Sequence, residues 1–96
     1  MSQPNFSLAA VKDLREILEF VARDNPKAAV AIVDKLEEVC NRLAENPHMG
    51  SPREDLRTRL RCFTSGSHVI YFRPTDHGID VLRVLHGSRD ATAIFR

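Results

Sequence analysis

The residues of this chain best suited to chemistry are basic side chains in its second half. Arginine presents a planar fork of donors that matches carboxylates and phosphates. Such a cluster could bind RNA phosphate and stabilise a phosphoryl-transfer transition state, or it could bind an acidic peptide. It could also be a set of solvated surface side chains. The residues concerned are Arg59, Arg61, His68, Arg83, His86 and Arg89.

The distribution of charge supports a recognition role for the second half of the chain. Residues 1–50 carry six basic and eight acidic side chains, a balance of −2. Residues 51–96 carry eight basic and five acidic side chains, a balance of +3, and all eight basic ones are arginines. The net charge of the whole chain is only +1, because the charges of the two halves nearly cancel. The excess of arginine in the second half favours binding to an anion or an acidic partner.

Other kinds of site lack the residues they need. The glycines stand alone at positions 50, 66, 78 and 87, so the sequence has no glycine-rich phosphate loop. Cys40 and Cys62 have no metal-ligand spacing, and both fall at positions expected to face the core. We therefore expect no metal and no cofactor.

Helical periodicity dominates the first half. Apolar residues recur at spacings of three and four from Val11 to Val21 and again from Ala29 to Leu43. Between these stretches, Asp24-Asn25-Pro26 ends one helix and begins the next, with Asn25 as N-cap and Pro26 at the first helical position. The short link predicts two antiparallel helices, a hairpin over residues 9–46.

The second half changes to strand periodicity. Three stretches rich in β-branched and apolar residues, separated by short turns, predict an antiparallel meander over about residues 58–86. Residues 5–8 could form a short extra strand, and residues 87–96 form a tail without a clear period. The sequence thus predicts an α+β fold, in which the helical hairpin packs on one face of a small antiparallel β-sheet.

Alternation along the strands divides their side chains between two faces. It places Val69, Tyr71, Leu82 and Val84 on one face. The other face would carry Ile70, Phe72, Val81 and Leu85 together with Arg59, Arg61, His68 and Arg83. A two-layer domain covers only one face of its sheet, so either the tail or a partner must cover the second, and we favour a partner.

The length of 96 residues predicts a single domain, 1–96. No apolar run reaches the roughly 20 residues that a membrane span needs, and the first residues do not resemble an export signal. With only two cysteines, we expect a reduced, cytoplasmic protein.

A series of motifs follows in order over about residues 6–95. The motifs are Asp13-Leu14-x-x-Ile17, Asp24-Asn25-Pro26-x-Ala28-Ala29, Leu43-x-x-x-Pro47-x-Met49-Gly50, Leu60-Arg61 and Val81-Leu82-Arg83-Val84-Leu85-His86-Gly87-x-Arg89-Asp90. The most specific is the His86-Gly87-Ser88-Arg89-Asp90 ending after an apolar strand. Together they resemble the ParE toxins of the RelE/ParE superfamily.

This resemblance implies the toxin of a type II toxin–antitoxin module. It implies a ParD-like antitoxin that wraps and neutralises the toxin in a hetero-oligomeric complex, and DNA gyrase as the target. The partner-binding residues would then be Arg59, Arg61, His68, Arg83, His86, Arg89 and Phe95. We expect neither a membrane nor sequence-specific nucleic acid as a partner.

The RelE branch of the superfamily implies an alternative, an endoribonuclease that cleaves messenger RNA. Arg59, Arg61, His68 and Arg89 stand where that branch has basic residues, but Phe95 stands where it has a tyrosine. A phenyl ring offers neither a proton nor a hydrogen bond, and arginine is a poor general base. We therefore expect a toxin that acts by binding and is not an enzyme.

Overall fold

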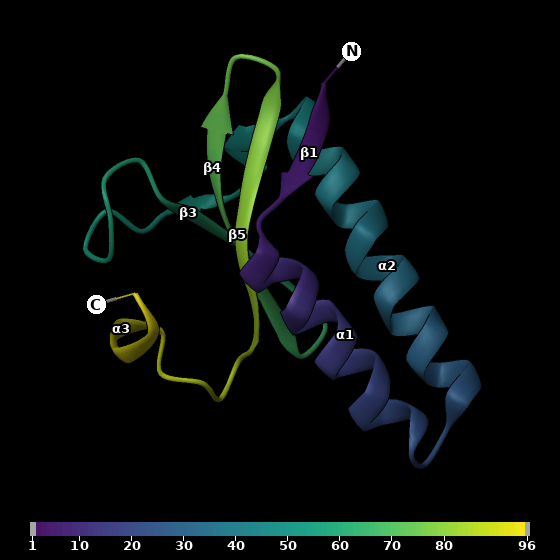
Figure 1. Ribbon diagram of the computed structural model, residues 1–96. Coiled ribbons are helices and arrows are strands. Elements are labelled where there is room, and N and C mark those ends of the chain that lie inside the picture. The colour runs from purple at the N-terminus through teal and green to yellow at the C-terminus, as the bar shows by residue number, and fades with distance from the viewer. Residues whose placement is uncertain (1, 96) are drawn as a thin grey trace.

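Two helices lie against one face of a five-stranded sheet in the computed structural model, which describes residues 2–95 (Figure 1). The sheet has the order β1-β5-β4-β3-β2. The elements are β1 (Gln3–Phe6), α1 (Leu8–Ala22), α2 (Pro26–Glu45), the 3₁₀ turn η1 (Pro47–Met49), β2 (Ser51–Pro52), β3 (Arg61–Ser65), β4 (His68–Thr75), β5 (Gly78–His86) and α3 (Ala91–Ile94).

The α+β fold with a helical hairpin on the sheet is confirmed, but the sheet is mixed. β1 pairs with β5 in parallel, whereas the other neighbouring strands are antiparallel. The extra strand runs over residues 3–6 and not 5–8. It ends there because Ser7 becomes the N-cap of α1, its hydroxyl accepting a hydrogen bond from the Ala10 N–H.

The helical hairpin forms as its linker sequence predicts. The Asn25 side chain accepts from the Ala28 N–H at 3.1 Å, and Pro26 occupies the first turn of α2. The apolar sides of both helices then meet the sheet in the larger core. That core contains Ala10, Leu36, Val39, Cys40, Leu43, Ala44, Ile70, Phe72, Ile79, Val81 and Val84. Burial raises the pKa of the Cys40 thiol to about 12, which keeps it an uncharged core residue.

A β-bulge in β5 changes which side chains share a face. Tyr71 pairs with Arg83, yet the next residue, Phe72, pairs with Val81, so Leu82 is an extra residue in β5. Beyond Leu82, the alternation of the β5 side chains between the two faces of the sheet is inverted. The predicted faces are therefore wrong at three positions: Arg83 shares the face of Tyr71, Val84 faces the helices, and Leu85 faces the opposite side.

The face for which a partner was predicted, the one with Ile70, Phe72 and Val81, is covered by the two helices, so that prediction is wrong. The C-terminal segment covers the opposite face of the sheet. Figure 1 shows α3 on the side of the sheet away from α1 and α2. Phe95 packs on Tyr71 with 5.1 Å between ring centroids, and Ala91 is also buried there. These side chains form the smaller core with Leu60 and Leu85. The tail is thus part of the domain.

Among residues 2–95, the structure contains no helix that is both long and apolar enough to cross a membrane.

The start of β5 requires a glycine, which leads to a first prediction. Gly78 has φ +141°, and a Cβ there would lie 2.1 Å from the Gln3 carbonyl oxygen of β1. Gly78→Ala is expected to lower the free energy of unfolding by about 1–3 kcal/mol in urea denaturation. Gly66→Ala is the matched control, because Gly66 also has a positive φ but has open space around it. An equal loss in both variants would mean that contact with β1 is not the cause.

Candidate functional site

The structure separates several of the basic residues that were predicted to act together. Arg61 turns towards the helical side of the sheet, where its Nε donates to the Pro47 carbonyl at 3.2 Å and its terminal nitrogen donates to the Gly50 carbonyl. These bonds hold the turn after α2 against β3. The prediction that Arg61 shares an open face with the other cations is therefore wrong.

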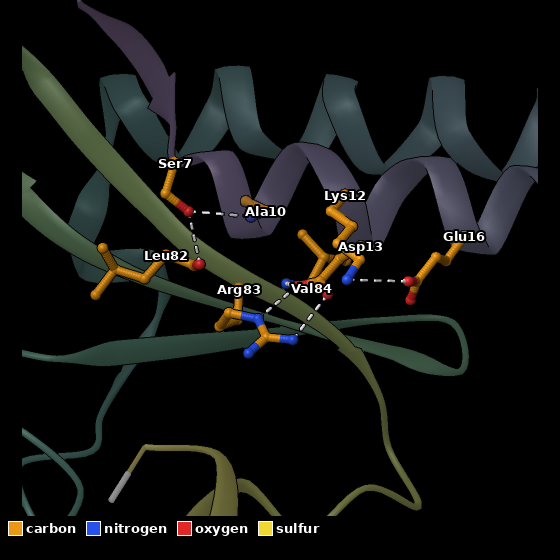
Figure 2. Close-up of polar contacts among 8 residues, drawn as sticks. All are labelled: Ser7, Ala10, Lys12, Asp13, Glu16, Leu82, Arg83 and Val84. Carbon is orange, nitrogen blue, oxygen red and sulfur yellow. Dashed lines mark hydrogen bonds and ion pairs between the residues drawn. The ribbon is translucent and has the colours of Figure 1, made fainter.

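Arg83 is held by a carboxylate of α1, as Figure 2 shows. Its Nε and a terminal nitrogen donate to the two oxygens of Asp13 at 2.8 and 2.9 Å. The same carboxylate accepts from the Val84 backbone N–H at 2.9 Å, and Asp13 is only 7% exposed. The paired carboxylate raises the pKa of the Arg83 guanidinium. Arg83 is thus engaged within the fold.

This ion pair closes an open edge of the sheet. β1 pairs with β5 only as far as Val81, so the polar groups of β5 beyond it need other partners. α1 supplies them: the Ser7 hydroxyl donates to the Leu82 carbonyl at 2.8 Å, and Asp13 accepts from Val84 (Figure 2). This role of Asp13 was not predicted from the sequence, because a carboxylate on an amphipathic helix is usually a solvated residue.

Two more predicted site residues are held by contacts within the domain. Arg59 has a left-handed backbone, φ 64°, and its guanidinium donates to the Pro74 carbonyl at 3.2 Å. It lines a small pocket together with Arg61. Phe95 is buried against Tyr71 and the guanidinium of Arg57, which lies 5.2 Å from the ring centroid, and belongs to the smaller core.

The remaining three predicted residues, His68, His86 and Arg89, line one groove between α1 and the end of β5. Its volume is about 480 Å³, and α1 contributes the apolar side chains Ile17, Phe20 and Val21. Phe20 is 69% exposed, which is unusual for an aromatic residue on a helix that packs on a sheet. We call this surface the α1–β5 groove.

The two histidines of the α1–β5 groove are in direct contact. Their ring centroids are 5.6 Å apart and the rings are nearly perpendicular, at 85°. Partial burial and the neighbouring His86 lower the pKa of His68, which favours its neutral form at pH 7. Arg89 is exposed beside them. The groove therefore combines an apolar wall with the cation of Arg89, and its lining also includes the carboxylates of Asp13, which is paired with Arg83, and Glu16. Arg89 can pair with an acidic group of a ligand whose apolar groups cover the wall.

The apolar wall of the groove was not predicted from the sequence either. Ile17 and Val21 were assigned to the buried stripe of α1, whereas Phe20 received no role. All three lie where α1 runs beside the last residues of β5. The sequence feature that could have indicated this wall is Phe20, an aromatic residue that lies outside the apolar stripe of its helix.

No group of three or more potential metal ligands occurs among residues 2–95. The α1–β5 groove is lined from three segments of the chain: α1, the start of β4, and the end of β5 with the turn after it.

The chain resembles proteins of toxin–antitoxin systems. It is 41% identical over 59 residues to Toxin ParE1 of Caulobacter vibrioides, covering 62% of this chain and 60% of that protein. It is 32% identical over 82 residues to Toxin ParE3 of the same species, covering 84% and 82%. Toxin ParE1 of Mycobacterium tuberculosis is 39% identical over 57 residues, or 58% of each chain. The match to the two ParE1 toxins thus spans about three fifths of their length.

Solved structures share the fold. The chromosomal ParDE TA system from P. aeruginosa superposes with a TM-score of 0.74 at 22% identity, covering 90% of this chain and 96% of that one. The toxin–antitoxin complex RelBE2 from Mycobacterium tuberculosis superposes with a TM-score of 0.61 at 22% identity, covering 88% and 96%.

The model of the family described as ParE toxin of type II toxin–antitoxin system, parDE, matches residues 5–91, which include both helices and all the longer strands. This chain belongs to the ParE toxin family.

Proposed function

We propose that this protein is the toxin of a ParDE-type pair, that a ParD-like antitoxin neutralises it, and that it inhibits DNA gyrase by binding alone. The observation that carries the proposal is the α1–β5 groove, an apolar surface with Arg89 at its rim, in a chain of the ParE family. His68, His86 and Arg89 are the predicted partner-binding residues that line it. The assignment of Arg59, Arg61, Arg83 and Phe95 to a partner stays a prediction.

The chemistry of the groove favours an acidic amphipathic segment of the antitoxin. Apolar side chains of such a segment would cover Phe20 and its neighbours, and a carboxylate would reach Arg89 at the rim. Burial of an exposed aromatic ring gives affinity, and the charged rim gives orientation.

The positions of the basic residues favour binding over RNA cleavage. Proton transfer and phosphate stabilisation need their groups around one reacting atom. Here Arg61 binds the turn at 47–50 on the helical side, whereas Phe95 lies buried on the other face and carries no hydroxyl. A RelE-like endoribonuclease would need these positions to converge.

The deciding experiment is a gyrase supercoiling assay with purified protein, run beside incubation of the same protein with messenger RNA and ribosomes. We expect supercoiling to stop, transcripts to stay intact and the antitoxin, the product of the neighbouring open reading frame, to restore supercoiling. Specific transcript cleavage, together with unimpaired supercoiling, would favour the endoribonuclease.

A matched pair of variants tests the antitoxin surface. Phe20→Ser removes the exposed ring of the groove, and Val30→Ser removes an exposed apolar residue, 53% exposed, on α2 outside it. We expect Phe20→Ser to weaken antitoxin binding by about tenfold or more in titration calorimetry, because buried aromatic residues dominate such interfaces. Val30→Ser should bind as the wild type does. Both substituted positions are exposed, so both variants should keep the wild-type melting temperature.

The charge of the rim is tested by Arg89→Glu, which should weaken binding further at low salt than at high salt. Equal affinity of Phe20→Ser, Arg89→Glu and the wild type would place the antitoxin on another surface.

A further inference from the structure

The arginines of the second half differ in what they bind within the fold. Among residues 2–95, Arg53 and Arg83 are the arginines that form ion pairs with carboxylates, and Arg61 donates to two backbone carbonyls. Three others have no acidic partner in this part of the chain and lie around a single buried residue, Leu60. We call them the Leu60 arginines: Arg57, Arg59 and Arg73.

The path of the chain around Leu60 brings these arginines together. The Leu60 N–H donates to the Arg57 carbonyl at 3.2 Å, and Arg59 directly precedes Leu60. The register of β3 and β4 places Arg73 beside Leu60 on the neighbouring strand, on the same face of the sheet as Tyr71. The Leu60 arginines therefore border the smaller core, on the side of the sheet away from α1 and α2.

The backbone of Arg59 is strained. Its φ of 64° is the only positive value of a residue other than glycine among residues 2–95. The Glu54 carboxylate accepts its N–H at 3.2 Å, and its guanidinium donates to the Pro74 carbonyl at 3.2 Å. A glycine would fit this backbone without strain, so the arginine side chain is held here at a cost to the fold. Strain of this kind gathers at functional sites.

A pocket and an unpaired donor lie beside the strained residue. The pocket has a volume of about 240 Å³, and its lining includes Arg59, Leu60 and Pro74. The Nε of Arg73 is buried and has no hydrogen-bond partner within the described part of the chain. A buried donor without a partner is costly. An anion bound to this guanidinium would compensate its charge.

The acidic residues nearby do not cancel the charge of the Leu60 arginines. Glu54 accepts from the backbone of Arg59, and Asp55 is already in an ion pair. Asp80 lies opposite Arg73 in the β4–β5 ladder but forms no ion pair among the described residues. Residues 53–73 hold five arginines and two acidic residues, so this part of the surface is positively charged.

The character of the surface favours a duplex over a single strand. The planar fork of a guanidinium matches the oxygens of a phosphate group. Proteins that bind single strands stack the bases on exposed aromatic rings. The aromatic residues of this face, Tyr71 and Phe95, are only 5% and 6% exposed. A duplex presents its phosphates while its bases stay stacked.

We propose that the Leu60 arginines bind the phosphate backbone of duplex DNA without reading its sequence. Arg57 is held 5.2 Å from the Phe95 ring centroid and Arg59 by the Pro74 carbonyl, so both are restrained before DNA binds, which lowers the entropic cost. The pocket beside them shares no residue with the α1–β5 groove. The proposal therefore does not depend on the antitoxin or on gyrase.

The test measures binding of the purified full chain to a labelled DNA duplex of mixed sequence by fluorescence anisotropy, without antitoxin or gyrase. Three phosphate contacts predict a slope of about −3 when the logarithm of the binding constant is plotted against that of the salt concentration. Arg57→Gln and Arg73→Gln should each weaken binding about threefold or more at low salt and reduce the slope by about one. Arg15→Gln, on an exposed residue of α1, is the matched control and should bind as the wild type does.

The strained position separates a binding role from a structural one. Arg59→Gly removes the guanidinium and the strain together. We expect it to lose as much DNA affinity as Arg57→Gln, although its urea midpoint is no lower than that of the wild type. Wild-type affinity of Arg59→Gly would count against the proposal.

Two measurements on the wild type keep the proposal testable if a variant folds poorly. In proton–nitrogen correlation spectra, amides of residues 53–60 should shift when the duplex is added, whereas amides of α1 should not. An unlabelled duplex of unrelated sequence should displace the label more effectively than poly-glutamate or single-stranded DNA or RNA. Stronger competition by any of these three, shifts confined to α1, or equal affinity of Arg15→Gln, Arg57→Gln and Arg73→Gln would overturn the proposal.

Discussion

Asp13→Ala is expected to lower the free energy of unfolding by about 3–5 kcal/mol. The variant leaves the Arg83 guanidinium without its carboxylate and the Val84 N–H without an acceptor at a covered sheet edge. For a domain whose total stability is about 5–15 kcal/mol, this loss brings the chain close to unfolding at 37 °C. Urea denaturation followed by circular dichroism measures it directly.

An exposed ion pair of similar geometry serves as the control. Arg53 binds both oxygens of Asp55 at 3.0 and 3.1 Å, yet Asp55 lies at the surface. Asp55→Ala should change stability little, because solvent competes with exposed pairs. The double variant Asp13→Ala/Arg83→Ala should lose less than the sum of its single variants, since both disrupt one interaction. Equal effects of Asp13→Ala and Asp55→Ala would contradict the role given to α1.

Leu36→Ala is expected to cost about 2–5 kcal/mol, through lost burial and the cavity that remains. Leu36 is 1% exposed and belongs to the core between α2 and the sheet. Val30→Ala on the same helix removes an exposed side chain and should leave the urea midpoint near that of the wild type. If Leu36→Ala melted within a degree or two of the wild type, the helix face assigned to the core would be wrong.

Local patterns predicted the helices well and the sheet less well. Asn25 and Pro26 act within one turn of chain, so their effect on the helical hairpin can be read without knowledge of the rest. Leu82 behaves differently, because the bulge that it forms depends on how β5 pairs with β4. Strict alternation then gave wrong faces to Val84 and Leu85, although each was rightly assigned to a strand.

The candidate site was predicted only in part for a similar reason. His86 is the last residue of β5, Arg89 follows it closely, and His68 lies opposite in the meander. The proximity of these three residues could therefore be predicted from the sequence. Arg61 and Arg83 were assigned to an open face because their intramolecular partners, a turn carbonyl and Asp13, lie far away in the chain. An apolar tail residue, Phe95, docks on this domain, an option that the sequence left open beside a partner.

The parallel pairing of β1 with β5 affects how this chain folds during its synthesis. β1 at residues 3–6 finds its strand partner only at residues 78–81, and Ser7 and Asp13 bind residues 82–84. The helical hairpin ends at residue 45. At elongation rates of about 5–20 residues per second, the ribosome needs a few more seconds to add the strands on which the hairpin packs. Contacts so distant in sequence also form slowly. The complete fold therefore cannot form before residues 78–84 have left the ribosome.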